Sequence, residues 1–167
     1  AEKFAMHVKG KEIPMHEPRG KVSLALAYAL SPTGADHMQA VHDPMYEKSV
    51  EELKCIGILR PMDRLNLKPE KVRAFMYLNI IWSLYDCLDI CKFVFAPHAN
   101  GVFKLTQVPE ILKAVTGWET SLFELMKVGE RALTMARVFN LREGFTSKDD
   151  SLPDRFFTGL ESGPRRG

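Results

Sequence analysis

Residues 69–88 read PEKVRAFMYLNIIWSLYDCL, and this stretch decides the fold. Pro69 suits the first turn of a helix, because that position needs no amide donor and the proline ring fixes φ near the helical value. Apolar side chains then fall on almost every face, which is typical of a helix enclosed by other elements. We therefore predict a helix from Pro69 to about Leu88 at the centre of the core. The apolar residues are Val72, Phe75, Met76, Ile80, Ile81, Trp82 and Leu84.

The segments on either side predict a mainly α fold, an irregular multi-helix domain of about five helices. Small and apolar residues fill 22–30, and Ser31-Pro32 stops that helix. Ser121 and Glu124 form a capping box that opens a late helix. The four further helices are predicted near 50–56 and at 22–30, 108–115 and 122–139.

A short β-hairpin is predicted at the N-terminus. Phe4, Met6 and Val8 alternate with more polar residues, as the two faces of a strand require. Gly10-Lys11 then turns the chain into a second strand that ends at Pro14.

Composition sets the broad class of protein. The chain has 167 residues, 46% hydrophobic and 26% charged, with a formal net charge of +2. This is the balance of one globular domain, and its dispersed basic residues argue against dedicated nucleic-acid binding. The apolar stretch near residue 80 is interrupted by Asn79, Ser83 and Asp86, so it does not predict a membrane span.

Cysteine usage and the chain ends add two expectations. Cys55, Cys87 and Cys91 cannot all pair with one another, so a reducing cytoplasm fits better than a disulfide scaffold. The chain opens without an initiator methionine or a signal peptide and ends in the loop 163–167. We therefore expect a fragment of a longer polypeptide.

The segment Asp86-Cys87-Leu88-Asp89-Ile90-Cys91-Lys92 carries the most chemistry. It places a carboxylate and a thiol five residues apart where the long helix ends. A thiolate there can ligate a soft metal, and a carboxylate can accept hydrogen bonds from a polar cofactor. The alternatives are a thiol packed as a small hydrophobe and an aspartate that caps backbone amides.

Seven short segments occur in an order that favours one family. They are His7–Pro14, His16–Arg19, Ala27–His37, Asp86–Lys92, Gly129–Arg131, Phe139–Gly144 and Asp149–Pro153. No single segment would suffice, but together they make the whole chain closely resemble the C-terminal helical part of the aldehyde:ferredoxin oxidoreductase family. Enzymes of this family carry a tungsten bis-pterin cofactor and a 4Fe-4S cluster.

The resemblance implies that residues 1–167 form a single C-terminal helical domain of a longer enzyme. That enzyme would oxidise a small aldehyde to a carboxylate at tungsten or molybdenum held by molybdopterin-type ligands, with ferredoxin as electron acceptor. Its other partners would be the remaining domains of the same polypeptide, with homo-oligomer formation left open. No nucleic-acid or membrane partner is expected, and the isolated fragment should be inactive.

The resemblance also assigns roles to particular residues. Cys91 would be the fourth thiolate of the cluster, the other three lying outside this chain. Asp86 would accept hydrogen bonds from the pterin, and Ile90 and Lys92 would contact the cofactor through their main chains. Two residues come from the earlier turn: His37 would transfer a proton beside the metal, and Gln39 would be a weaker cofactor contact in place of a basic residue. His16 is taken as structural.

One departure from the family pattern lies just before Cys91. Asp89 and Ile90 stand where the family typically has glycine and leucine. Aspartate is among the better substitutes at positive φ, so we expect the turn to survive. An added negative charge near a cluster should also lower its reduction potential.

Two other readings remain open. A family member could instead reduce an aromatic acyl thioester on the same scaffold. The substitutions at Asp89 and Gln39 also leave room for a helical structural or interaction module without a cofactor.

Overall fold

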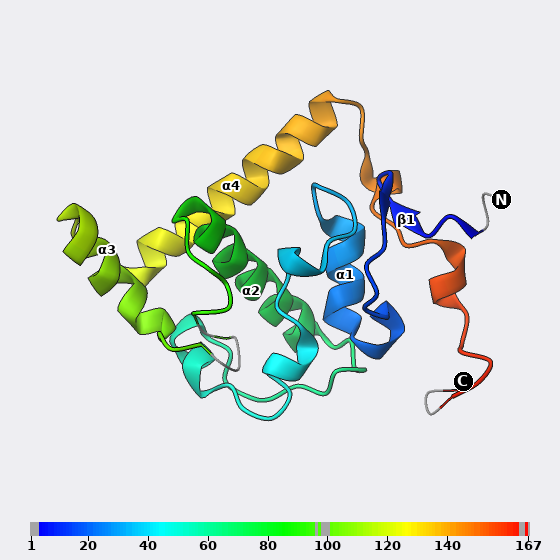
Figure 1. Cartoon of the computed structure of the whole chain (residues 1–167), viewed down its shortest axis with the longest axis horizontal. Coiled ribbons are helices and arrows are strands. Elements are labelled where there is room, and N and C mark those ends of the chain that lie inside the picture. The colour runs from blue at the N-terminus through cyan, green and yellow to red at the C-terminus, as the bar shows by residue number, and fades with distance from the viewer. Residues whose placement is uncertain (1–3, 96, 98–100, 164–165, 167) are drawn as a thin grey trace.

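The computed structural model describes residues 4–95, 97, 101–163 and 166. Helix α2, Pro69–Cys87, runs through the middle of the molecule with α1, Val22–Leu30, beside it (Figure 1). The predicted central helix is therefore confirmed. The residues that α2 buries differ in part from the prediction: Val72 and Met76 are 40% and 54% exposed, whereas Lys71 is buried. The buried α2 residues are Lys71, Ala74, Phe75, Leu78, Ile81, Trp82, Leu84 and Tyr85.

The mainly α architecture is confirmed, and each predicted helix has a counterpart. Beside α1 and α2 these are α3, Val108–Thr116, and α4, Leu122–Arg142, with the 3₁₀ helix η5, Glu51–Ile56, at the expected short helix. The capping box at Ser121 and Glu124 is also present. Short 3₁₀ helices complete the described elements: η2 Pro18–Gly20, η3 His37–Gln39, η4 Asp43–Met45, η6 Leu105–Gln107, η7 Ser147–Asp149 and η8 Asp154–Phe157.

The N-terminal hairpin is present but shorter than predicted. Strands β1, His7–Val8, and β2, Lys11–Glu12, pair antiparallel, with His7 opposite Glu12. The turn is formed by Lys9 and Gly10, one residue earlier than the predicted Gly10-Lys11, because Lys11 pairs with Val8 in the hairpin. Lys9 and Gly10 have φ of 49° and 79°, the left-handed values that such a two-residue turn requires.

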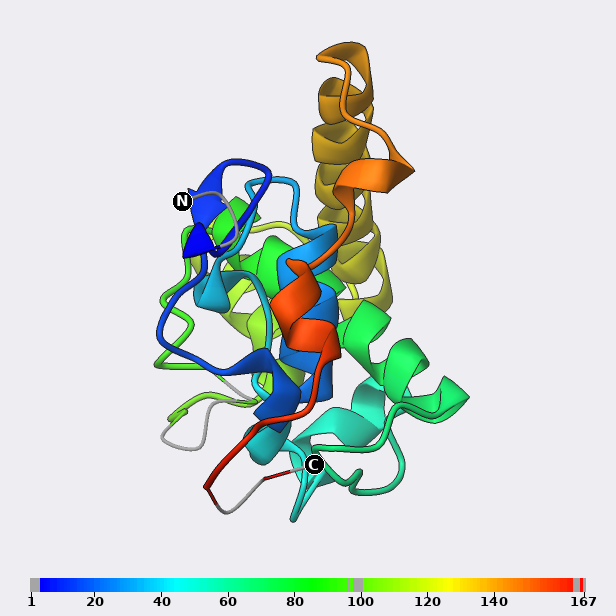
Figure 2. The same ribbon diagram turned by 90° about the vertical axis from the view of Figure 1, so that its right-hand side faces the viewer.

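Helices α2 and α4 cross at a glycine. A Cβ placed on Gly129 would lie 2.3 Å from the Ile80 carbonyl oxygen and 3.0 Å from the Leu84 nitrogen, so the two backbones are in contact there. Beyond the crossing, the C-terminal half of α4 projects past α1 and α2 (Figures 1 and 2). Phe139 in that half is 62% exposed.

Two apolar clusters form the core. The larger surrounds α2 and includes residues from 41–58 and from α3 and α4. The smaller joins Val8 of the hairpin, Leu24 and Tyr28 of α1, and Phe75 of α2 to Ala35 and Ala40. Because Ala35 and Ala40 flank η3, the smaller cluster fixes the segment that carries His37.

Candidate functional site

The end of α2 turns sharply, as predicted. Asp89 has φ of 59°, the left-handed value for which aspartate can replace glycine. The amide of Ile90 then donates to the Tyr85 carbonyl oxygen at 2.9 Å and closes the reversal. The turn therefore survives without glycine and directs the chain into Cys91 and Lys92.

Cys91 lies at the protein surface. All three cysteines are free and exposed, so the packed-thiol alternative does not describe Cys91 here. The described residues contain no group of three or more His, Cys, Asp or Glu side chains that could hold a metal by themselves. Cys91 can therefore offer one accessible thiolate to a centre shared with other residues.

Lys92 connects the two parts of the candidate site. Its side chain is 8% exposed, and Nζ lies 2.8 Å from Asp86 Oδ2 and 3.1 Å from the Met38 carbonyl oxygen. The Asp86 carboxylate stands at the unfavourable C-terminal end of a helix, and this ammonium compensates it. The side chain of Lys92 thus holds the Cys91 loop against η3, a role that the sequence did not predict.

Asp36 positions His37 at the start of η3. Its Oδ1 accepts from the Met38 amide at 2.8 Å, and its Oδ2 lies 2.7 Å from Lys11 Nζ. Burial raises the pKa of the Asp36 carboxyl, but these hydrogen bonds outweigh burial and bring the pKa below its usual range. Gly34 brings the turn against the hairpin, since a Cβ there would lie 2.5 Å from the Val8 carbonyl oxygen.

Three histidine rings cluster beside η3, and two of them contact the same lysine. The ring centroids of His16 and His37 are 4.8 Å apart, those of His16 and His42 4.8 Å, and those of His37 and His42 5.9 Å. Lys21 Nζ lies 3.3 Å from His16 Nδ1 and 3.2 Å from His42 Nδ1. Sequence reasoning missed this cluster because spacings of 21 and 5 residues match no metal or helix pattern.

Two of the three histidines are held neutral. Burial lowers the pKa of His42 to about 4, and the positive charge of Lys21 adds to the effect, while the hydrogen bond to His37 opposes it. Burial and then Lys21 also lower the pKa of His16. At neutral pH both rings are therefore uncharged.

Two further predicted site residues are Gln39 and Ile90. Gln39 ends η3 and is half-buried, and Ile90 packs against the larger apolar cluster. The structure thus brings Asp86, Ile90, Cys91 and Lys92 together in one turn, and Lys92 links that turn to the helix of His37 and Gln39.

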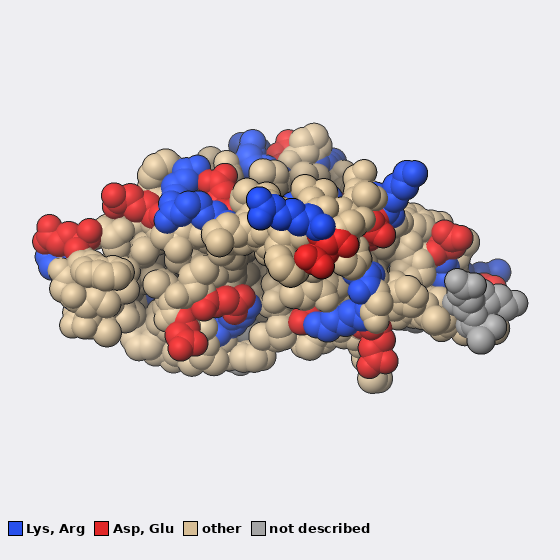
Figure 3. All heavy atoms as spheres, turned by 90° about the horizontal axis from the view of Figure 1, so that it is seen from above, with Lys and Arg blue, Asp and Glu red and all other residues tan. Residues whose placement is uncertain are grey.

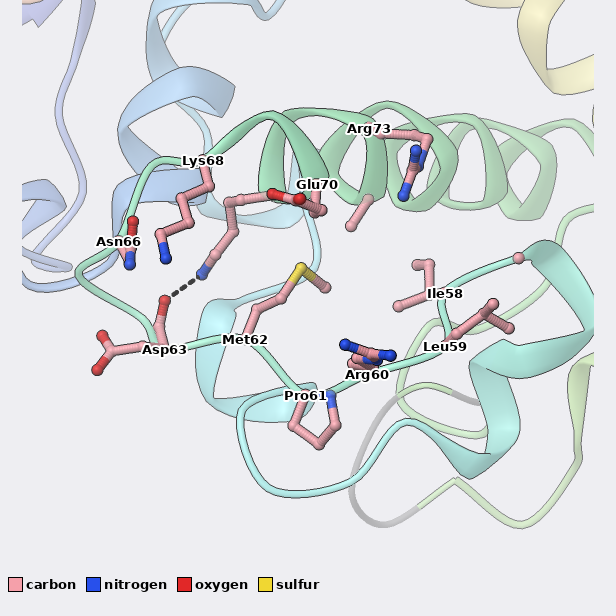
Figure 4. A pocket seen from close by; sticks show the side chains of 13 residues that line it. Ile58, Leu59, Arg60, Pro61, Met62, Asp63, Asn66, Lys68, Glu70 and Arg73 are labelled. Atoms are coloured by element: carbon pink, nitrogen blue, oxygen red, sulfur yellow. Dashed lines mark hydrogen bonds between the residues drawn. The ribbon is translucent and has the colours of Figure 1, made fainter.

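A separate hollow of about 550 Å³ lies near the N-terminal end of α2, opposite the end that leads to Cys91. Figure 4 shows Arg60, Lys68 and Arg73 around it, and the dashed line is the hydrogen bond from Lys71 Nζ to the Asp63 carbonyl oxygen at 2.6 Å. None of the predicted site residues lines this hollow.

The surface charge is mixed. Figure 3 shows acidic and basic side chains interspersed on the face that it draws, without a continuous basic field. Within the described part of the chain, no helix is both long enough and apolar enough to span a membrane.

Residues 1–167 match the family model described as aldehyde ferredoxin oxidoreductase, domains 2 & 3. The chain belongs to the aldehyde ferredoxin oxidoreductase family. The resemblance drawn from the sequence landmarks is thereby confirmed over the whole chain.

Curated relatives agree with this assignment. The chain is 31% identical over 166 residues to the tungsten-containing aldehyde ferredoxin oxidoreductase of Thermococcus kodakarensis, covering 98% of this chain and 25% of that protein. It is 32% identical over 174 residues to the enzyme of the same name from Pyrococcus horikoshii, covering 100% and 26%. The aliphatic sulfonate oxidoreductase, WOR-like subunit, of Pyrococcus furiosus is 28% identical, covering 99% and 22%. The chain therefore spans about a quarter of the length of these relatives.

Proposed function

We propose that residues 1–167 are the C-terminal helical domain of a tungsten or molybdenum bis-pterin oxidoreductase that also carries a 4Fe-4S cluster. The whole enzyme oxidises an aldehyde to a carboxylate and passes electrons to ferredoxin. Family membership supports the reaction class. The observation that carries the site is Lys92, whose buried ammonium joins the Cys91 turn to the helix of His37.

The residues present fit the proposed groups. Cys91 offers an exposed thiol, the ligand type that iron–sulfur clusters use. Asp86 is 54% exposed beside its lysine partner, so it can still accept hydrogen bonds from pterin N–H groups. Ile90 and Lys92 supply main-chain contacts in the same turn, and the amide of Gln39 supplies a further polar contact. When bound, the metal–pterin group and cluster would supply the two-electron chemistry and single-electron transfer.

His37 is the proposed proton-transfer residue. Its main-chain carbonyl accepts from His42, whereas its ring nitrogens make no hydrogen bond with any described residue. Its ring lies against His16 and edge-on to His42, so its position is held while its nitrogens stay free. A proton donor or acceptor for a bound substrate needs this combination.

The remaining domains of the same polypeptide are the proposed structural partner. The chain has a quarter of the length of its relatives, and it exposes large apolar side chains on α3 and α4. Met135, Val138 and Phe139 are 72%, 44% and 62% exposed on adjacent turns of α4. Exposed apolar surface of this kind is typical of a domain interface. We place the protein in the cytoplasm, which suits its three free thiols.

Metal analysis of the full-length protein, purified without oxygen, tests the function. We expect tungsten or molybdenum, iron, and aldehyde-dependent reduction of ferredoxin. Cys91→Ala should remove the cluster signal in electron paramagnetic resonance, whereas the exposed Cys55→Ala control should keep it. Wild-type iron content in Cys91→Ala would contradict the ligand role.

His37→Ala should keep the metal and iron content and lower kcat by about 10²- to 10⁴-fold, the usual contribution of a proton-transfer group. An unchanged kcat would remove His37 from the mechanism.

Reduction of an aromatic acyl thioester on the same scaffold is the alternative reaction. The Pyrococcus furiosus protein named as an aliphatic sulfonate oxidoreductase subunit matches almost the whole chain, so proteins named for different substrates share this part of the sequence. Parallel assays with aldehydes and with aromatic thioesters separate the two. A full-length protein without tungsten, molybdenum or iron would instead favour a structural module.

A further inference from the structure

Lys21 occupies a position where lysine is unfavourable for the helix. It is the N-cap of α1, and its side chain makes no capping hydrogen bond. Ser, Thr, Asp or Asn at this position would stabilise the helix by about 1 kcal/mol. A positive charge also opposes the partial positive charge at a helix N-terminus. Local helix stability therefore does not explain this residue, and the contacts of its ammonium do.

These contacts fix the tautomers of two histidines. An ammonium has hydrogen-bond donors and no acceptor, so His16 Nδ1 and His42 Nδ1 must both present lone pairs to Lys21 Nζ. Each neutral ring then carries its proton on Nε2. For His42 this proton points to the His37 carbonyl oxygen, 3.1 Å from Nε2. Both nitrogens of His42 are thus engaged in one continuous chain from Lys21 to His37.

The same arrangement locates the His37 ring. His42 holds the His37 main chain, and the His16 ring lies 4.8 Å from the His37 ring at an interplanar angle of 37°. His16 is itself held by Lys21. The imidazole of His37 is therefore supported on two sides by rings whose orientation depends on one ammonium.

We propose that Lys21, through His16 and His42, positions His37 for proton transfer. This inference rests on the proposed function of His37. The three supporting residues are positioning residues and touch neither substrate nor cofactor. The ammonium acts as a fixed donor that imposes the Nε2–H form on both neighbouring rings.

The first test reads the tautomers directly in the full-length protein. ¹⁵N-histidine NMR, assigned by single substitution of each of the five histidines in residues 1–167, should show unprotonated Nδ1 and protonated Nε2 for His16 and His42 at pH 7.5. Lys21→Met should produce a tautomer mixture at both residues, Lys21→Arg should keep the wild-type signals, and the exposed Lys48→Met control should change nothing. Nδ1–H tautomers in the wild type, or wild-type signals in Lys21→Met, would overturn the proposal.

The second test uses the full-length enzyme. Lys21→Met should keep the metal and iron content and the aldehyde KM but lower kcat by about 10- to 100-fold, the cost of a misplaced catalytic group. Lys21→Arg should recover most of kcat. If His37→Ala impairs turnover and Lys21→Met does not, this inference fails and the proposed function stands. If the wild type lacks metal and aldehyde oxidation, the proposed function fails, whatever the NMR result.

Discussion

The buried ammonium of Lys92 donates to the main-chain carbonyl of Met38, 54 residues earlier in the chain. The same nitrogen contacts Asp86 Oδ2, so one side chain joins α2, the Cys91 turn and η3. A thiol and an imidazole proposed for the same centre are thereby held by a shared contact, although they come from distant segments.

Lys92→Met should lower the free energy of unfolding of the chain by about 1–3 kcal/mol, because a partly buried carbonyl and a carboxylate each lose a partner. Urea denaturation measures the loss, and hydrogen exchange should become faster at residues 37–39. The exposed Lys48→Met serves as the control. Equal stability of the Lys92 and Lys48 variants would show that the link contributes nothing.

Lys71→Met should lower the free energy of unfolding of the chain by about 3–5 kcal/mol. Lys71 Nζ lies 2.9 Å from Asp43 Oδ1, and the two side chains are 1% and 0% exposed. Removing the lysine leaves a buried carboxylate without its ion-pair partner. The double variant Lys71→Met/Asp43→Asn should recover part of the loss, measured by urea denaturation. A double variant less stable than Lys71→Met would contradict this explanation.

Gly129→Ala should destabilise the chain by about 1–3 kcal/mol. In an open helix this change stabilises by about 1 kcal/mol, so the sign is reversed by the contact with α2. The new Cβ would meet the Ile80 carbonyl oxygen and the Leu84 nitrogen. Thermal unfolding measures the change, with the 72%-exposed Met135→Ala as a control on the same helix. A higher Tm for Gly129→Ala than for the wild type would show that the backbones of α2 and α4 are not in contact at Gly129.

Stability should fall as the pH is lowered from about 6.5 toward 5. The pKa of His42 is about 4 in the folded chain, against 6.5 for the free side chain. The unfolded state therefore binds more protons in this window, and acidification favours unfolding. Because the ring is partly exposed and solvent screens it, we expect a loss of about 1 kcal/mol between pH 7 and pH 5.

His42→Gln should make this pH dependence shallower. The pKa of His16 is shifted in the same direction, so some pH dependence of stability should remain in this variant. The groups that face His42 are His16, Lys21 and His37. Urea denaturation at pH 7, 6 and 5 provides the measurement. Parallel curves for wild type and His42→Gln would exclude His42 as the source.

The helices could be predicted from the sequence because helix ends depend on residues within one turn of each other. Pro69 fixes the first turn of α2, and Ser121 and Glu124 satisfy each other's backbone amides within one turn. The positive φ of Asp89 followed from the limited set of residues that tolerate it. Which faces of α2 are buried did not follow, because apolar residues lie on almost every face of this helix and no pattern marks Val72 and Met76 as exposed.

The amino-acid sequence by itself determined the helix order, the turn before Cys91 and the family. Tertiary structure alone decided that Lys92 reaches Met38, that Lys21 lies between His16 and His42, and that Gly129 meets Ile80. These contacts join residues 5 to 54 positions apart, and their geometry depends on how α1, α2 and α4 pack. Periodicity records which residues a helix can bury, whereas the partner of a buried charge is set by the packing of the whole chain.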